Sequence, residues 1–426
     1  MLYNMDISTI PSDIEKLIVK YRKDLYKHLQ SKVTKKINET DKKIINSNLK
    51  LFLYNCVISS VSTGNFAMTF DKNSYRKSPI RNGVTLRTKP SYGYTRKILD
   101  YFVERGLVSY ELGKREWKRF KVRGRWVSET EDKPTIVTLK HTFREQCTDL
   151  EVTPQTYFQI NCLILRDKDK QDAKFKRDLY QKEKIKMLTD YNVRALETEI
   201  TKVSGGKYLL QLRKIYNEDF YSGGRMYDLV IQKMPKKERK CLIIDNESVA
   251  LLDYKSFETS LAYTLCDEVM QGDPYVIDFE EYHPDVVRSV CKLIMTRIFN
   301  CDSPTTLSYL VNQYIHDHYN LENMVTEGKI PEKRIPVGMF VDILMQKHEA
   351  IEEYFFGGGE HNLQFIGSQV VDYIIEKSMQ NHSSLVIPVF DEIICQESMA
   401  TDVIGYMEDA YVQILGSKIN CKVERE

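Results

Sequence analysis

Two apolar runs in the C-terminal half of the chain each end at an aspartate. The run VALL leads into Asp253, and the run LVIPVF leads into Asp391. A helical pattern begins directly after Asp253, whereas the chain after Asp391 turns back as a second apolar strand. This alternation predicts an α+β fold in which helices back an antiparallel sheet, with the two carboxylates close together at the sheet edge.

Two rigidly held carboxylates are what a pair of Mg²⁺ ions requires, because Mg²⁺ takes one or two protein carboxylates together with substrate phosphates. Two such ions, about 3.5–4 Å apart, hold the attacking and leaving oxygens of an in-line displacement. On spacing alone, an aspartate at a strand end is more often a turn residue than a metal ligand.

Composition narrows the class of protein. A chain of 426 residues has room for two or three domains, and its 62 basic and 60 acidic residues nearly cancel. No apolar run approaches the roughly 18 residues of a membrane span, and the N-terminus lacks the pattern of a secretory signal. Nine dispersed cysteines without a CxxC pair favour a reducing compartment and disfavour structural zinc. We therefore expect a cytoplasmic protein without a membrane partner.

The first half of the chain predicts a nucleic-acid-binding module. SYGYTRKILDYFVERG predicts a helix that Ser91 or Thr95 caps and Gly106 ends. WKRFKVRGRWVS and TIVTLKHTF predict a two-stranded wing around SETEDKP, so that helix and wing resemble a winged-helix module. The charged stretch 165–200 predicts a long solvated helix or a helix pair. The expected divisions are a helical lead-in over 1–47, the winged-helix-like module over 48–150, a thumb-like helical connector over 151–205 and the catalytic domain over 206–426.

Basic residues concentrate in this module. Between Ser91 and Trp126 ten basic side chains are opposed by four acidic ones, with aromatic residues among them. Clustered cations bind phosphates and aromatic rings stack on bases, which favours DNA contacts by Arg96, Lys97 and Arg119. A solvated basic hairpin with core aromatics is an equal alternative.

Segments of the C-terminal half resemble, in order, the motifs of family A DNA polymerases. DYKSFETSLA is similar to the DYSQIELR motif A, and VFDEII is similar to the VHDEIV motif C. GGRMYDLVIQKMP resembles the TGRLSS…LQNIP segment before motif A, RSVCKLIMTRIFN the start of motif B, and HNLQFIGSQVVDYII the helix before motif C. The resemblance covers residues 210–416, is nearest to small phage- and plasmid-type members, and implies a palm with short fingers.

The resemblance implies a role for each matching residue. The implied ligands of two Mg²⁺ ions, or of Mn²⁺ in their place, are Asp253, Asp391 and the backbone of Tyr254. The implied nucleotide-binding residues are Arg288, Lys292, Thr296 and Glu258, of which Lys292 would also protonate the pyrophosphate and Glu258 would exclude a ribose 2′-hydroxyl. The implied DNA-binding residues are Arg213, Arg225, Gln364 and Glu392.

Four positions depart from the family pattern. Phe390 stands in place of the histidine of motif C, Thr296 and Asn300 stand in place of two aromatic residues of motif B, and Cys301 stands in place of a glycine. These differences bear on sugar discrimination and on template-base insertion, and they leave the metal ligands unchanged.

We therefore expect a template-directed DNA polymerase that adds deoxynucleotides to a primer 3′ end. Its expected partners are primer–template DNA, deoxynucleoside triphosphates and replication accessory proteins. Two alternatives stay open. The altered motif B is compatible with a primer-independent or untemplated nucleotidyltransferase, and the basic N-terminal module is compatible with a DNA-binding replication initiator whose palm is inactive.

Overall fold

The structure is a computed structural model in which most of the chain is described. The described residues are 12–34, 36–60, 64–68, 80–85, 90–113, 115–122, 125–132, 135–150, 161–203, 205, 207–208, 210–228, 230–357 and 362–426. Side chains are described at all of these except 12–13, 80–81, 84–85, 115–122, 125–132 and 207. The chain forms two compact units, the first of Met1–Ile215 and Tyr227–Val249, and the second of Tyr216–Met226 and Ala250–Glu426. The division predicted at residues 47, 150 and 205 stays a prediction.

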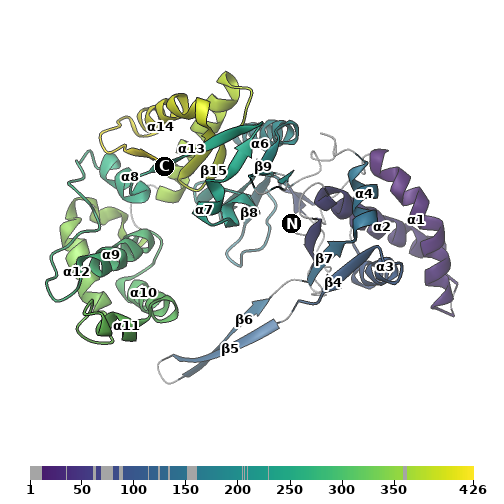
Figure 1. Ribbon diagram of the computed structural model, residues 1–426, viewed down its shortest axis with the longest axis horizontal. Helices are drawn as coiled ribbons and strands as arrows, with labels where there is room; N and C mark the ends of the chain where they lie inside the picture. The colour runs from purple at the N-terminus through teal and green to yellow at the C-terminus, as the bar shows by residue number, and fades with distance from the viewer. Residues whose placement is uncertain are drawn as a thin grey trace. The chain divides into compact units, whose positions relative to one another are not determined.

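The first unit mixes helices with short antiparallel strands (Figure 1). Its helices are α1 (Ser12–Ser31), α2 (Glu39–Ser60), α3 (Tyr92–Glu104), α4 (His141–Thr148), α6 (Leu179–Glu197), η2 (Ile231–Lys233) and α7 (Lys236–Arg239). Its strands are β1 (Asn65–Met68), β2 (Ile80–Arg81), β3 (Val84–Thr85), β4 (Val108–Glu111), β5 (Arg115–Val122), β6 (Arg125–Asp132), β7 (Thr135–Leu139), β8 (Leu163–Arg166), β9 (Ile200–Lys202), β10 (Lys207–Tyr208) and β13 (Leu242–Ile244). Strand β11 (Arg213–Asn217) begins in this unit.

Helix α2 forms the centre of the N-terminal part of this unit. Every residue from Leu51 to Ser60 is buried, which is typical of a helix with neighbours on all sides. Helices α1, α3 and α4 and strand β1 pack against it. The buried amide of Asn48 accepts hydrogen bonds from the Ser91 N–H (2.9 Å) and the Thr95 hydroxyl (2.7 Å). The predicted side-chain cap by Ser91 is therefore wrong, because α2 supplies the acceptor at the start of α3.

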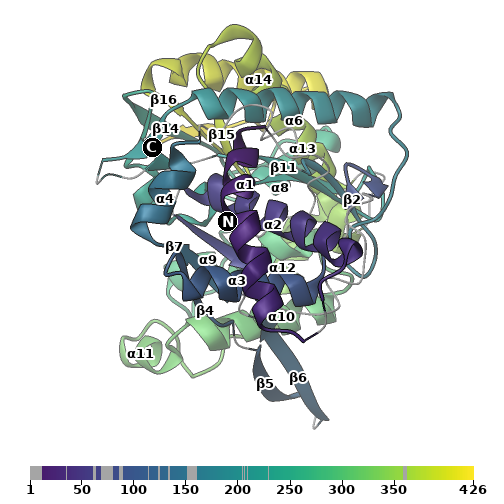
Figure 2. The same ribbon diagram turned by 90° about the vertical axis from the view of Figure 1, so that its right-hand side faces the viewer.

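The predicted wing has a different pairing. Strand β5 pairs with β6, with Val122 opposite Arg125, and β7 pairs with both β1 and β4. The predicted pairing of WKRFKVRGRWVS with TIVTLKHTF was wrong, because the first segment is divided between β5 and β6, which pair with each other, whereas β7 pairs with β1 and β4. The two views agree that the β5–β6 hairpin projects away from the sheet β1-β7-β4 (Figures 1 and 2).

The helix predicted over 165–200 begins only at Leu179. The residues before it form β8 and a tight turn, in which the Asp167 carboxylate accepts hydrogen bonds from the N–H groups of Asp169 (3.0 Å) and Gln171 (2.9 Å). Asp178 and Gln181 then form a capping box that starts α6. Local side-chain bonds of this kind compete with the helix and explain why the prediction failed here.

The second unit contains strands of two sheets and two groups of helices. Its strands are β12 (Gly223–Tyr227), β14 (Glu247–Tyr254), β15 (Ile387–Val389), β16 (Glu392–Gln396) and β17 (Val423–Arg425). Its helices are α8 (Phe257–Leu265), α9 (Pro284–Ile298), α10 (Pro304–His318), α11 (Leu321–Thr326), α12 (Val337–Lys347), η3 (Glu349–Gly357), α13 (Leu363–Asn381), η4 (Glu397–Met399) and α14 (Ala400–Leu415). Strand β14 begins in the first unit and ends in the second.

The sheet of the second unit has the order β15-β16-β14, and β17 also pairs with β14. Helices α8, α13 and α14 pack on one another, whereas α9, α10 and α12 form a separate group (Figure 1). The segment GSQVVDYIIEKSMQ lies in α13 and SMATDVIGYMEDAYVQILGS contains α14, and the hairpin expected where the chain turns back after Asp391 is confirmed. The expectation of an antiparallel sheet backed by helices is thereby confirmed for this unit.

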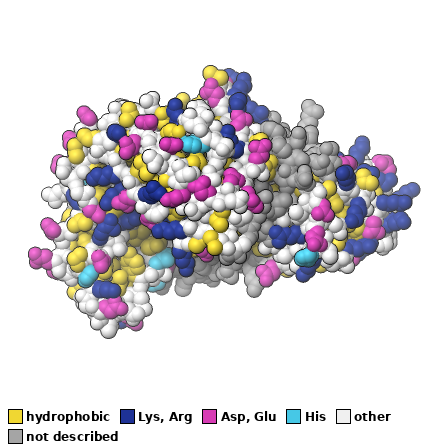
Figure 3. Space-filling view, turned by 45° about the horizontal axis from the view of Figure 1, so that its top comes forward, with side chains coloured by type: hydrophobic (Ala, Val, Ile, Leu, Met, Phe, Trp, Pro, Cys, Tyr) yellow, Lys and Arg dark blue, Asp and Glu magenta, His cyan; other side chains and the backbone are white. Residues whose placement is uncertain are grey.

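The surface of the described residues is polar and mixed in sign. None of their helices has the length and apolar character needed to cross a membrane. On the face drawn in Figure 3, acidic and basic side chains are interspersed, as the near balance of the two types leads one to expect.

The aromatic core of the first unit offers a test of this packing. Phe102 is fully buried, and its ring centroid lies 4.8 Å from that of Phe52, 5.1 Å from that of Tyr21 and 5.4 Å from that of Phe143. Phe102→Ala should lower the free energy of unfolding by about 3–5 kcal/mol, because it leaves a cavity among rigid rings. Urea denaturation measures the change. Val19→Ala, at a 56% exposed position of α1, should change it by less than about 0.5 kcal/mol. A similar loss in both variants would contradict the packing.

Candidate active site

A cavity of about 520 Å³ in the second unit brings together most of the residues predicted to act in catalysis. The predicted residues that line it are Arg225, Asp253, Tyr254, Glu258, Arg288, Lys292, Thr296, Gln364 and Asp391. They come from segments far apart in the sequence, namely β12, the end of β14, α8, α9, α13 and the β15–β16 turn. The sequence motifs therefore converge on one hollow.

The two aspartates are fixed by tight backbone geometry. Asp253 is the penultimate residue of β14, and Asp391 is the second residue of the two-residue turn between β15 and β16. Phe390, the first turn residue, has a φ of 60°, a conformation that usually requires glycine. A positive φ at a residue other than glycine costs about 1–3 kcal/mol. It persists where the surrounding structure imposes it, often at functional sites. The strained turn holds Asp391 beside the end of β14.

The electrostatics of the cavity show that the two carboxylates are close. Burial, together with the negative charges of Asp253 and then of Glu258, raises the pKa of Asp391 to about 6, against the opposing effects of a backbone hydrogen bond and of Arg225. Two acids that repel each other in a partly buried site need a counter-charge, which a divalent cation supplies.

The donor set fits Mg²⁺ only as a site that substrate completes. Among the described residues, no cluster of three or more His, Cys, Asp or Glu side chains could hold a metal ion by itself. Asp253 and Asp391 offer carboxylate oxygens, and Mg²⁺ characteristically adds water and substrate phosphates to one or two carboxylates. The side chain of Tyr254 is buried and donates to the Met407 carbonyl (2.7 Å), which leaves only the backbone of Tyr254 for the ligand role that the resemblance implies.

A polar network joins Arg225 to Glu258. The Arg225 guanidinium donates to the Glu258 carboxylate (2.5 Å), Asn300 bonds to the same carboxylate, and Gln364 donates to Asn300. Burial raises the pKa of Glu258, while Arg225 and Asn300 act in the opposite direction. Glu258 thus lies on the cavity wall with its position fixed from two sides.

Glycine is required next to Arg225. Gly224 has a φ of 76°, and a Cβ at this position would lie 2.7 Å from the Ser368 Oγ and 2.8 Å from the Tyr216 ring. The backbone of β12 can approach α13 this closely only without a side chain. This close approach places Arg225 over the cavity, where its guanidinium lies 5.8 Å from the Phe390 ring centroid.

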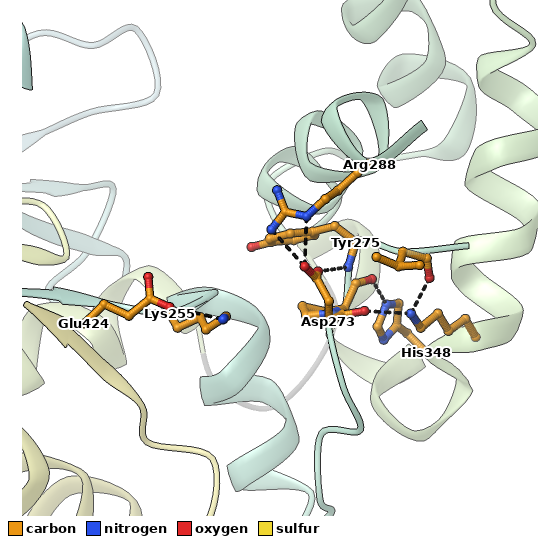
Figure 4. Close-up of polar contacts among 9 residues, drawn as sticks. Lys255, Asp273, Tyr275, Arg288, His348 and Glu424 are labelled. Atoms are coloured by element: carbon orange, nitrogen blue, oxygen red, sulfur yellow. Dashed lines mark hydrogen bonds and ion pairs between the residues drawn. The ribbon is translucent and has the colours of Figure 1, made fainter. Parts of the chain in front are cut away.

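One face of α9 carries Arg288, Lys292 and Thr296 at intervals of four residues, and all three line the cavity. Pro284 at the start of the helix and the His283 side chain, which accepts from the Asp285 N–H, define where α9 begins. Arg288 donates from both Nε and Nη2 to the Asp273 carboxylate, each at 2.8 Å (Figure 4).

The segment that holds Arg288 is itself anchored. The Lys347 ammonium donates to the carbonyls of Asp273 (2.9 Å) and Val276 (2.5 Å). His348 is buried and lies 2.9 Å from the Pro274 carbonyl (Figure 4) and 2.9 Å from the Tyr263 hydroxyl. Burial lowers the pKa of His348, so that it is a neutral hydrogen-bonding residue of the fold.

The sequence analysis missed four residues of this site: Asp273, Tyr275, Lys255 and Glu424. Tyr275, Lys255 and Glu424 line the cavity, and Asp273 binds Arg288. Tyr275 is buried under the Arg288 guanidinium (5.6 Å to its ring centroid), and its hydroxyl bonds to Ser256. Lys255 stands within motif A and could have been noticed there, whereas the other three belong to no motif and enter through tertiary contacts.

The remaining predicted residues lie outside the cavity lining, and their DNA contacts stay predictions. Glu392 is buried in β16, with an exposure of 4%. Arg213 belongs to the first unit, where its charge lies near Asp172 and Cys162. In α3, Arg96 pairs with Asp100 (3.3 Å) and the Lys97 ammonium lies 5.4 Å from the Tyr94 ring centroid. Arg119 lies in β5 opposite Ser128, and its side chain is outside the described residues.

Comparisons with known proteins add little. No known family model matches the chain, and no curated protein matches it. Among solved structures, the chain is similar to the POL domain of Pol1 from M. smegmatis in complex with DNA primer-template and dNTP. The identity is 11%, the TM-score is 0.31, and the match covers 99% of this chain and 67% of that one. Similarity at this level carries no argument about function, which therefore rests on the cavity.

Burial of Asp391 and its repulsion by Asp253 predict a pH-dependent gain in stability for Asp391→Asn in metal-free protein. The pKa of Asp391 is about 6 in the folded protein, against an ordinary value of 3.8. Protonated Asp391 therefore stabilises the folded state below about pH 4, and this stability is lost as the pH rises through 6. At pH 8 in EDTA the variant should therefore be more stable by about 1–3 kcal/mol. The difference should shrink as pH falls towards 4.

Urea denaturation at pH 8, 6 and 4 measures this effect. Asp409→Asn, which removes an exposed carboxylate of α14 outside the cavity lining, is the matched control and should change stability little at any pH. Equal behaviour of the two variants would show that Asp391 is not held against a like charge.

Proposed function

We propose that the second unit is a nucleotidyltransferase that acts on nucleoside triphosphates and, more specifically, a template-directed DNA polymerase. The observation that carries this proposal is the meeting, in one cavity, of the Asp253–Asp391 pair with the cationic face of α9. A pair of carboxylates that requires cations, next to side chains that bind polyphosphate, matches the needs of phosphoryl transfer.

The reaction joins a primer 3′-oxygen to the α-phosphorus of the nucleotide and breaks the bond from that phosphorus to pyrophosphate. Two Mg²⁺ ions held by Asp253, Asp391 and substrate oxygens would supply charge neutralisation and alignment of the two oxygens. Arg288 and Lys292 bind the triphosphate through charge-assisted hydrogen bonds. Lys292 then gives a proton to the pyrophosphate oxygen as that bond breaks.

Arg225 and Gln364 are the proposed contacts to the nucleic acid within the cavity. Arg225 is 33% exposed in its ion pair with Glu258, and the cavity wall formed by α13 carries Gln364. A guanidinium at this place suits a phosphodiester, since its fork of donors binds phosphate oxygens in pairs. DNA as the polymer, and a role in replication of a phage or other mobile element, are inferred from the motif resemblance.

Selection of deoxynucleotides is assigned to Glu258. Its carboxylate is 15% exposed at the cavity wall and is held by Arg225 and Asn300, so it can stand against a ribose 2′-hydroxyl without moving. The Asn300 bond is notable because the resemblance places an aromatic residue there.

The first unit is proposed to hold duplex DNA. The order α3, β4, hairpin β5–β6 and β7, with the sheet β1-β7-β4, supports a winged-helix-like module in this proposal. Ten basic residues between Ser91 and Trp126 would supply the phosphate contacts.

Primer extension tests the proposal. Purified protein with Mg²⁺ or Mn²⁺, a labelled primer–template and each deoxynucleotide in turn should add the nucleotide that the template specifies. Asp253→Asn and Asp391→Asn should each reduce the rate by about 10³-fold or more, because each removes charge that holds the metals. Asp409→Asn serves as the control and should retain full activity.

Each alternative gives a different result. Addition without primer or template would indicate the untemplated nucleotidyltransferase. DNA binding with no addition under any metal and nucleotide would favour the replication initiator. Addition that survives both aspartate substitutions would reject the proposed site.

Sugar selection gives a separate prediction. Glu258→Ala should raise the relative use of ribonucleotides, measured as the ratio of kcat/KM values, by about tenfold or more, because the 2′-hydroxyl gains room. Asn300→Ala should change the ratio in the same direction but less, since it only loosens Glu258. Glu408→Ala, which removes a glutamate outside the cavity lining, should leave the ratio unchanged. An unchanged ratio in Glu258→Ala would assign sugar selection elsewhere.

A further inference from the structure

The C-terminal strand contributes a charged residue to the cavity that no motif includes. Strand β17 pairs with the end of β14 so that Glu424 lies directly opposite Asp253. Directly opposed residues of antiparallel strands project on the same face. Lys255 follows Asp253 by two residues, and its N–H donates to the Lys422 carbonyl (2.9 Å), which continues the pairing. Asp253, Lys255 and Glu424 therefore share one face, and all three line the cavity.

Lys255 and Glu424 form an ion pair at this place. The Lys255 Nζ lies 3.1 Å from the Glu424 carboxylate, and the two side chains are 41% and 55% exposed (Figure 4). Ion pairs this exposed contribute only about 0–1 kcal/mol. This ion pair favours one orientation of Lys255, and it is weak enough for a ligand of higher charge to displace the Glu424 carboxylate.

The cationic face of α9 lies on another wall of the same cavity. Figure 4 shows Lys255 and Glu424 on one side and Arg288, Tyr275 and Asp273 on the other. Burial raises the pKa of Asp273, but the Tyr275 N–H and Arg288 lower it on balance, and Lys255 adds to that lowering. Lys255 thus acts electrostatically on the segment that holds Arg288. A polyphosphate bound to Arg288 would face Lys255 as well.

We propose that Lys255 is a further phosphate-binding residue of this site, held in place by Glu424 until a triphosphate displaces that carboxylate. The C-terminal strand is then part of the nucleotide site, because β17 both orders the end of β14 and supplies the acid that positions Lys255. The identity of the ligand rests on the proposed function, whereas the cation itself is tested by binding alone.

A second exposed lysine–glutamate ion pair in the same unit serves as a control for Lys255 and Glu424. Lys418 pairs with Glu408 at 2.7 Å, with side chains 58% and 43% exposed, and neither residue lines the cavity. The two ion pairs are similar in chemistry and exposure and differ in place. Lys418→Ala therefore controls for the loss of one exposed lysine and its ion pair.

Binding of inorganic tripolyphosphate with Mg²⁺, measured by titration calorimetry on the full chain, tests the proposal. Lys255→Ala should raise Kd about tenfold, the effect of losing one charge-assisted hydrogen bond. Lys255→Arg and Lys418→Ala should bind within about twofold of wild type. Circular dichroism checks folding, and Lys255→Gln gives a second truncation should the alanine variant unfold.

Glu424→Gln tests whether Glu424 acts by holding Lys255 in place or only through its own negative charge. It should tighten tripolyphosphate binding about threefold, and this gain should disappear when it is combined with Lys255→Ala, because the two residues act as a pair. A gain that persists in the double variant would mean that Glu424 acts without Lys255, and the holding role would be wrong.

Other outcomes decide between the two proposals. Equal Kd values for wild type and Lys255→Ala, or equal losses in Lys255→Ala and Lys418→Ala, would overturn the role of Lys255 even if primer extension succeeds. No binding of tripolyphosphate by wild type would overturn it as well. Lys255-dependent binding without any nucleotide addition would uphold the phosphate site and reject the polymerase.

Discussion

The repulsion between Asp253 and Asp391 is the constraint on which the site depends. One carboxylate ends a strand and the other occupies a strained two-residue turn, so neither can move away from the other at small cost. Burial and this proximity raise the pKa of Asp391 to about 6. A bound cation would relieve this repulsion, and this is the physical link between the two strand-end aspartates and the proposed metal-dependent phosphoryl transfer.

The cations around the aspartates follow a common pattern. Arg225 pairs with Glu258, Arg288 with Asp273 and Lys255 with Glu424, and each of these pairs is at least partly exposed. Each basic side chain is therefore oriented before any ligand binds, and Arg288 and Lys255 can exchange their carboxylates for a phosphate without leaving a deeply buried charge unpaired. Orientation in advance lowers the entropy that binding must offset. The cavity is thus prepared for a polyanion on several walls at once.

Local patterns made part of this structure predictable. The hairpin at Asp391 was predicted from a short-range pattern. The Asp245-Asn246 turn, where both residues have positive φ, and the helix that carries Arg288 follow short-range rules as well. Contacts between segments that lie far apart in the sequence could not be predicted. Nothing in the sequence near β7 says that it pairs with β1 and β4, and nothing near Glu424 places it opposite Asp253. Tyr275 likewise enters the site only because α9 and the chain around Lys347 hold its loop.

The most direct test of the account is the number of divalent ions that the cavity binds. Electron paramagnetic resonance counts bound Mn²⁺ in the presence of primer–template and a non-hydrolysable deoxynucleoside triphosphate. The account predicts two ions per chain, and their loss when Asp253 and Asp391 are both changed to asparagine. No bound Mn²⁺ in wild type, or an equal count in the double variant, would contradict it.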